Sequence, residues 1–136
     1  MKKIVSLVVM LVFTLWVCVA CSKPPKPTPE EQDVLGALKK VQEGVDAKIG
    51  YDDFSRLLDD AGSKIETLKR AEKKSDCFLN AASKCFASYE IGGKAWKLKD
   101  EAKDEKRRMD MDTTLSFSMG FASVSLAKAD ECFKKK

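Results

Sequence analysis

Cysteine is the residue type with the most chemistry to offer in this chain, which has 136 residues, five cysteines and no histidine. Without histidine the chain lacks the commonest general base and metal ligand, and both Ser-His-Asp and Cys-His catalysis are excluded. Cys18 and Cys21 end an apolar N-terminal run, whereas Cys77, Cys85 and Cys132 are spread over the rest of the chain. The first set indicates where the protein is located, and the second indicates how it is held together.

The N-terminal run has the composition of a secretory signal. Lys2 and Lys3 precede an uncharged apolar stretch over 4–20, which is at the short end of what spans a bilayer. The stretch is hydrophobic on every face, so it has no amphipathic stripe to bury in a domain. We therefore expect a signal segment over 1–20, with an uncleaved membrane helix as the alternative.

The sequence "CVAC" at the end of this run resembles the lipobox of bacterial lipoproteins. Val19, Ala20 and Cys21 match the family pattern, and Cys18 stands where leucine is usual. A lipobox ending at Cys18 would place bulky Val17 before the cysteine, which fits less well. The resemblance, which covers about the first 30 residues, implies cleavage before Cys21 and attachment of membrane lipid to Cys21.

The residues after the cysteine agree with a lipoprotein layout. The stretch 21–29 contains all four prolines of the chain and favours an extended spacer. Ser22 follows Cys21, and the resemblance implies that a residue other than aspartate there directs the protein to the outer membrane, facing the periplasm. Loss of Lys2 and Lys3 lowers the net charge from +4 to +2, so no nucleic-acid partner is implied.

Helical periodicity runs through the rest of the chain, residues 30–136, and no strict period-two stretch occurs. We expect an all-α, antiparallel bundle of about four helices at roughly 30–48, 52–73, 76–106 and 112–134. A capping box of Thr28 and Glu31 starts the first helix. The third helix is expected to continue through Gly92 and Gly93, with Gly92 allowing a neighbouring helix to approach closely.

The last helix carries a core stripe of six apolar residues, namely Leu115, Met119, Ala122, Leu126, Ala129 and Phe133. Phe117, Phe121 and Val124 are expected to widen this stripe. Interspersed serines permit tight packing against a neighbour.

A second resemblance concerns "GYDDFSRLL" and "ASYEIGGKAW", which are similar to segments of small bacterial helical proteins of no assigned activity. Tyr89, Gly92 and Trp96 occupy the positions of that motif. Tyr89 and Trp96 lie on the stripe that the third helix would bury, which favours core filling. They are also the ligand-binding residues of the alternative function, a periplasmic carrier of a small ligand.

An oxidising periplasm favours a disulfide among the remaining cysteines. Cys77 and Cys85 lie eight residues apart on one expected helix, about 12 Å, which is beyond disulfide reach. Cys132 is therefore expected to be one partner. The turn expected near residue 108 favours Cys85–Cys132, and Cys85 also lies on the buried stripe, whereas a turn near residue 104 would favour Cys77–Cys132.

Acidic residues offer little further chemistry. The pairs Asp52–Asp53 and Asp59–Asp60 are expected to face solvent, and "RRMDMD" has no EF-hand spacing. We therefore expect no catalytic residue, cofactor or metal, and no enzyme. The sequence predicts an envelope lipoprotein with a non-catalytic helical domain for structure or interaction. Its partners would be membrane lipid and possible envelope components, either another protein or peptidoglycan, to which the terminal Lys136 offers one route of attachment.

Overall fold

The computed structural model describes residues 26–134, and this part of the chain is entirely helical apart from short connections. Its helices are α2 (Pro29–Asp46), α3 (Tyr51–Arg70), α4 (Asp76–Glu101) and α5 (Glu105–Glu131). The predicted all-α bundle is confirmed, with no strand among the described residues. None of the described helices is both long and apolar enough to cross a membrane. The predicted signal segment, Cys21 and Lys136 lie outside the described residues.

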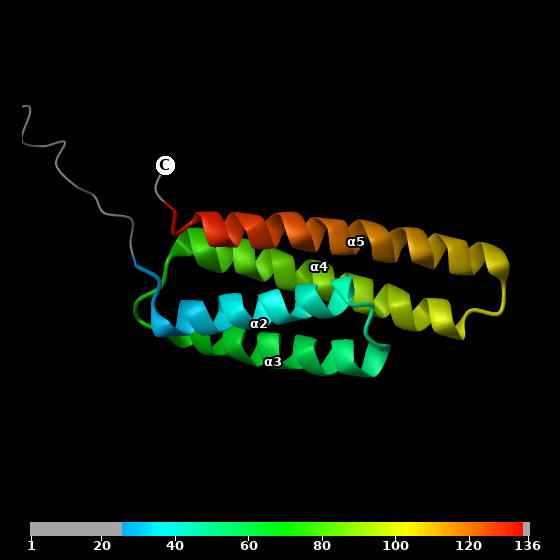
Figure 1. Cartoon of the computed structure of the whole chain (residues 1–136), viewed down its shortest axis with the longest axis horizontal. Helices are drawn as coiled ribbons and strands as arrows, with labels where there is room; N and C mark the ends of the chain where they lie inside the picture. The colour runs from blue at the N-terminus through cyan, green and yellow to red at the C-terminus, as the bar shows by residue number, and fades with distance from the viewer. Residues whose placement is uncertain (1–25, 135–136) are drawn as a thin grey trace, which may run out of the picture.

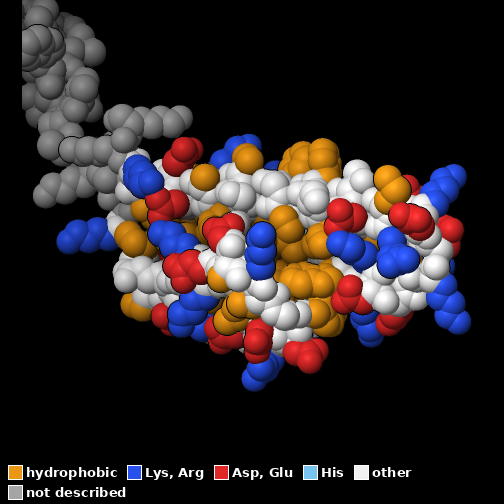
Figure 2. Space-filling view, turned by 45° about the vertical axis from the view of Figure 1, so that its right-hand side comes forward, with side chains coloured by type: hydrophobic (Ala, Val, Ile, Leu, Met, Phe, Trp, Pro, Cys, Tyr) orange, Lys and Arg blue, Asp and Glu red, His pale blue; other side chains and the backbone are white. Residues whose placement is uncertain are grey.

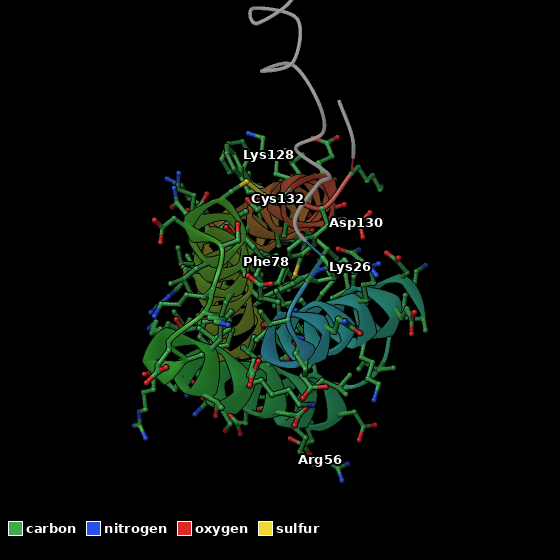
Figure 3. All side chains as sticks on the ribbon, turned by 90° about the vertical axis from the view of Figure 1, so that its left-hand side faces the viewer. Lys26, Arg56, Phe78, Lys128, Asp130 and Cys132 are labelled. Atoms are coloured by element: carbon green, nitrogen blue, oxygen red, sulfur yellow. A yellow bond between two sulfur atoms is a disulfide. The ribbon has the colours of Figure 1, made fainter. Side chains whose placement is uncertain are left out.

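The helices form two antiparallel hairpins of unequal length. Figure 1 shows α5 lying along the whole of α4, while α2 and α3 cover only the part of α4 farther from the α4–α5 turn. Seen along the bundle, α3 and α5 lie at opposite corners, and each of them contacts both α2 and α4 (Figure 3). The buried hydrophobic side chains of α2 to α5 form one closed core. The four described helices therefore share a single hydrophobic core.

The predicted capping box at the start of α2 is present, and it does more than cap one helix. The Thr28 hydroxyl accepts a hydrogen bond from the Glu31 amide at 3.2 Å, and Glu31 Oε2 accepts one from the Thr28 amide at 2.8 Å. Glu31 Oε1 accepts a third hydrogen bond, from the Ser75 amide at 2.6 Å. Because Ser75 caps α4, one buried carboxylate ties the N-terminal ends of α2 and α4 together.

The turn between the long helices lies earlier than predicted. The sequence indicated a third helix to about residue 106 and a last helix from about 112, but α4 ends at Glu101 and α5 begins at Glu105. The cause is Asp104, whose carboxylate accepts a hydrogen bond from the Arg107 amide at 3.0 Å and so caps α5. The three-residue spacing from Asp104 to Arg107 also suits an ion pair within a continuing helix, so the spacing alone does not place the turn.

The predicted continuity of α4 through Gly92 and Gly93 is confirmed, and both glycines are buried at helix contacts. A Cβ atom on Gly92 would lie 2.8 Å from Met119 Cε of α5. A Cβ on Gly93 would lie 3.0 Å from the Phe54 ring of α3. The two glycines thus let α4 approach a different helix on each side, as was expected for Gly92.

The disulfide joins Cys77 to Cys132, with their Cα atoms 6.0 Å apart. The favoured pairing of Cys85 with Cys132 was wrong, and Cys85 is a free, buried thiol. The physical reason is the early turn, because in an antiparallel hairpin the residues equidistant from the turn face one another. Moving the turn from near residue 108 to residues 102–104 brings Cys77, instead of Cys85, level with Cys132.

Candidate interaction surface

Tyr89 and Trp96, the predicted ligand-binding residues, are both engaged in packing. Tyr89 is fully buried, and its hydroxyl donates a hydrogen bond to Gln42 Oε1 at 2.7 Å. The Phe54 ring lies near both, with centroids 6.4 Å from Tyr89 and 5.6 Å from Trp96. Half-buried Trp96 also meets Tyr51 edge-on at 6.0 Å. This arrangement is the core filling that the buried stripe favoured.

The surroundings of Cys85 make its thiol unreactive. Its side chain is fully buried one helical turn from Tyr89, and burial raises the pKa of its thiol to about 12. Burial also raises the pKa of the Tyr89 hydroxyl. Because the thiolate is the reactive form of cysteine, a thiol kept neutral in an apolar site is a poor nucleophile.

The acidic residues do not converge. Within residues 26–134, no group of three or more cysteine or carboxylate side chains is arranged to hold a metal ion. Asp112 of the "RRMDMD" segment instead forms an ion pair with Lys99 across the α4–α5 hairpin. The Asp53 and Asp60 carboxylates pair with basic side chains one turn away on α3.

The feature that sequence reasoning missed is an apolar face on the outside of α5. Phe117, Phe121 and Val124 were expected to be buried, but they are 67%, 54% and 55% exposed. They follow one another at spacings of four and three residues, so they share one face of the helix. Ile91 of α4, 52% exposed, adds to the same surface.

This face is exposed because α5 uses small residues for its core contacts. The buried side chains of α5 are Ser118, Ala122, Leu126 and Ala129. Small side chains allow α5 to approach α4 closely, and the side of α5 turned away from that contact is left with the phenylalanines. The signal was present in the sequence, because apolar residues on two sides of one helix cannot all face a single neighbour.

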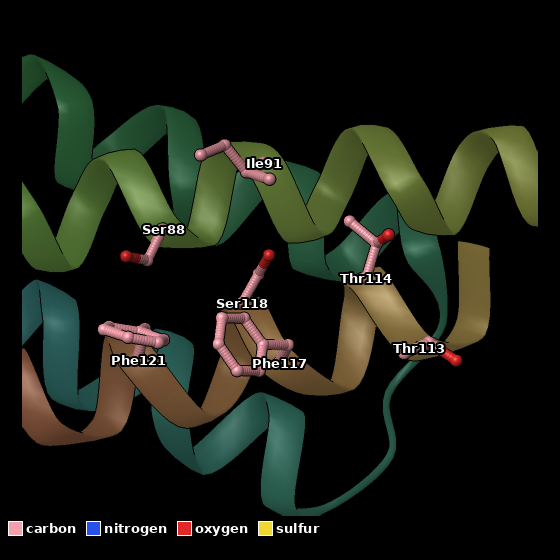
Figure 4. A pocket seen from close by; sticks show the side chains of 7 residues that line it. All are labelled: Ser88, Ile91, Thr113, Thr114, Phe117, Ser118 and Phe121. Atoms are coloured by element: carbon pink, nitrogen blue, oxygen red, sulfur yellow. The ribbon is translucent and has the colours of Figure 1, made fainter. Parts of the chain in front are cut away.

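A groove of about 510 Å³ runs between α4 and α5 at this face. Figure 4 shows it with Ile91 and Ser88 on α4 and the two phenylalanines on α5, and with α2 and α3 behind the pair. The complete lining is Ser88, Ile91, Thr113, Thr114, Phe117, Ser118 and Phe121. Neither Tyr89 nor Trp96 lines this groove. Figure 2 shows another side of the molecule, where hydrophobic side chains gather near the middle and charged side chains lie around them.

Charged residues continue the exposed face of α5 toward both helix ends. We call the whole row the outer stripe, which consists of Lys106, Asp110, Thr113, Phe117, Phe121, Val124, Lys128 and Glu131. Successive members are three or four residues apart, so all lie on one side of α5, and all are exposed. Among the described residues, none of its four charged side chains takes part in an ion pair within 4.0 Å.

Together these features define a disulfide-bridged helical bundle with an apolar outer face. In comparisons with known proteins, no family model, no curated protein and no solved structure matches the chain.

Proposed function

We propose that this protein is a lipid-anchored protein of the bacterial envelope, most consistent with the outer membrane, whose helical domain acts by non-catalytic contact with another molecule. The observation that supports the contact role most is the exposed apolar face formed by Phe117, Phe121, Val124 and Ile91. Aromatic side chains gathered on a surface, with polar residues around them, are typical of interaction sites.

The Cys77–Cys132 disulfide supports an exported protein. Disulfides persist in the periplasm and are rare in the cytosol of mesophiles, where thiols are kept reduced. An exported protein in turn supports the interpretation of residues 1–20 as a signal and of Cys21 as the lipid attachment site. The disulfide belongs to the folded domain and the signal to the N-terminal sequence, so each supports export independently of the other.

The spacer sets how far the domain can move from the membrane. A fully extended chain covers about 3.3–3.6 Å per residue, so the stretch 21–29 spans no more than roughly 30 Å. A domain tethered in this way stays within about its own length of the lipid surface. Its contacts are therefore proposed to be with components of, or close to, the same membrane.

Substitution of Cys21 tests the anchor. The full chain with its own signal is expressed in a Gram-negative host, and the mass of the protein from the membrane fraction is measured. We expect a lipid-modified protein that begins at Cys21, and Cys21→Ser should leave an unmodified precursor. Cys18→Ser is the matched control and should keep the lipid. A lipid adduct that survives Cys21→Ser would refute the anchor.

A periplasmic carrier of a small apolar ligand is the second candidate. The α4–α5 groove favours it, because about 510 Å³ is within the range of ligand sites, roughly 300–1,000 Å³. Titration with a fluorescent apolar probe should show saturable binding that Ser88→Phe abolishes by filling the groove. Trp96→Ala tests the site predicted from sequence. Binding lost only in Trp96→Ala would place the ligand there, and no binding at all would exclude the carrier.

A further inference from the structure

The outer stripe of α5 has a symmetry in its chemistry. Its centre is apolar, with Phe117, Phe121 and Val124, and each end carries one basic and one acidic side chain. Counted inward from the N-terminal end, the charged residues are basic Lys106 and then acidic Asp110. Counted inward from the C-terminal end, they are acidic Glu131 and then basic Lys128. This order matters for what the stripe can bind.

Two copies of the stripe complement each other when they run antiparallel. If a two-fold axis crosses α5 at the level of Met119, Phe117 lies opposite the partner's Phe121, and symmetry repeats that contact. Val124 lies within one residue of the level of the partner's Thr113, which belongs to the stripe and also lines the groove. The apolar centre of one copy therefore covers the apolar centre of the other.

The same register pairs every charge with its opposite. Asp110 lies opposite the partner's Lys128, and Lys106 lies within one residue of the level of the partner's Glu131, so four ion pairs are within reach in the dimer. In a parallel dimer each charged residue would instead face the same residue of the partner, so like charges would meet. We propose that the outer stripe is the interface of an antiparallel, two-fold symmetric dimer of this chain.

The surface near the axis has room for a partner helix. A Cβ atom built on Gly120 would have no neighbour within 4 Å, so this position is open on the outside of α5. The absence of a side chain at Gly120 lets two α5 helices approach closely there. The groove between Phe117, Phe121 and Ile91 offers space for the partner's phenylalanine rings.

The size of the surface predicts a reversible dimer. Each phenylalanine contributes at most about 150–250 Å², and both are only partly exposed, so the apolar centre provides a few hundred Å² per copy. A standard stable interface needs about 800 Å² per partner. Self-association is thus weak in solution, and tethering two copies to one membrane would raise their effective concentration. The inference takes the contact role proposed above as given and names the partner, but it does not require the lipid.

Sedimentation equilibrium of oxidised residues 22–136 at increasing concentration tests the dimer. We expect a monomer–dimer equilibrium that Phe117→Ser with Phe121→Ser abolishes. Met109→Ser is the matched control, because Met109 is 66% exposed on α5 but lies off the outer stripe, and it should leave the dissociation constant unchanged. Circular dichroism shows that each variant keeps its helices.

Charge reversal tests the register. Asp110→Lys alone and Lys128→Asp alone each create two like-charge contacts per dimer and should weaken association about tenfold. The double variant Asp110→Lys with Lys128→Asp restores both pairs and should restore the wild-type dissociation constant. An interface in any other register would give losses that add in the double variant.

Cysteine cross-linking tests the axis. Gly120→Cys should form a disulfide between two copies under mild oxidation, and Gly36→Cys, an equally open position on α2, should not. A chain that stays monomeric at all concentrations overturns the inference, including one that instead binds lipid vesicles. Since the domain tested carries no lipid, that failure is separate from a failure of acylation at Cys21.

Discussion

The two halves of the α4–α5 hairpin are built differently. In the half covered by α2 and α3, side chains of four helices meet in one core, and the disulfide closes the end. Beyond Trp96, where Tyr51 of α3 makes its contact, no side chain of α4 is buried, and none on α5 is buried before Ser118. This second half, which we call the hairpin tip, comprises residues 97–117. Figure 1 shows it extending past α2 and α3.

Two equally regular parts of one helical hairpin are thus stabilised by different interactions. The covered half is held by burial of apolar surface, whereas the tip depends on local interactions and on its connection to the covered half. Those interactions are the Asp104 cap, the Lys99–Asp112 ion pair and side-chain hydrogen bonds of Thr113 and Thr114 to carbonyl groups one turn earlier.

Truncating a core ring should show the difference in stability between the two halves most clearly. Phe54→Ala removes a fully buried ring that packs on Gly93, Tyr89 and Trp96, so we expect the free energy of unfolding to fall by about 3–5 kcal/mol. Met109→Ala in the tip should change it by less than about 0.5 kcal/mol. Urea denaturation of oxidised residues 22–136 measures both. If both variants lost the same free energy of unfolding, Met109 in the tip would contribute to stability as much as a core ring.

Removing the disulfide should have the next largest effect. Cys77→Ala and Cys132→Ala each open a loop with a sequence separation of 55 and should lower the free energy of unfolding by about 2–4 kcal/mol. Added reductant should then cause no further loss in either variant. Cys85 should resist alkylation in the folded protein and react after denaturation, because its pKa is raised to about 12 by burial. Peptide mapping that linked Cys85 to Cys132 would contradict the structure.

Removing the carboxylate that joins α2 to α4 should cause the third largest loss in the free energy of unfolding. Glu31→Ala leaves the Thr28 and Ser75 amides without their acceptor, so we expect a loss of about 1–3 kcal/mol in the free energy of unfolding. Glu30→Ala is the matched control, since Glu30 lies in the same first turn and shares the favourable interaction with the helix dipole. A similar loss in both variants would mean that Glu31 acts only through the dipole.

Exposed ion pairs should matter least, and one in each half can be compared. Asp130 of the covered half accepts a hydrogen bond from Lys39 of α2 at 3.0 Å, and it also pairs with Lys134. The hydrogen bond from Lys134, then that from Lys39, hold the Asp130 pKa below its usual value. Asp130→Asn and Asp112→Asn should each cost less than about 1 kcal/mol, with the smaller loss at Asp112 in the tip.

The pH dependence of the Asp130 contribution has a defined sign. A folded-state pKa below the unfolded value means that the contribution is present above the ordinary pKa of an aspartate. It is lost as the pH falls through the lowered folded-state value. Denaturation measured at neutral and acidic pH, at low and high salt, should show this loss in the wild type and not in Asp130→Asn. A contribution that grew on acidification would contradict the assignment.

Much of the fold could be predicted because it depends on local patterns. The start of α2 follows from the Thr28–Glu31 capping box, and the continuity of α4 follows from an apolar stripe that does not shift at Gly92. The turn could not be placed in the same way. Asp104 suits both a helical ion pair and a helix cap, and the sequence spacing does not distinguish them. An error of a few residues there transferred the disulfide from Cys77 to Cys85.

The candidate surface was harder to predict than the fold. Phe117 and Phe121 belong to an apolar pattern on α5 that is too wide for one neighbour, and the pattern does not say which side the neighbour takes. That choice depends on the distance between α4 and α5, which Gly92 and Ala122 keep short. The helices, their order and the apolar character of both sides of α5 thus follow from the order of residues alone. Which side of α5 is buried and which cysteines meet depend on the fold, because both are set by how two helices lie against each other.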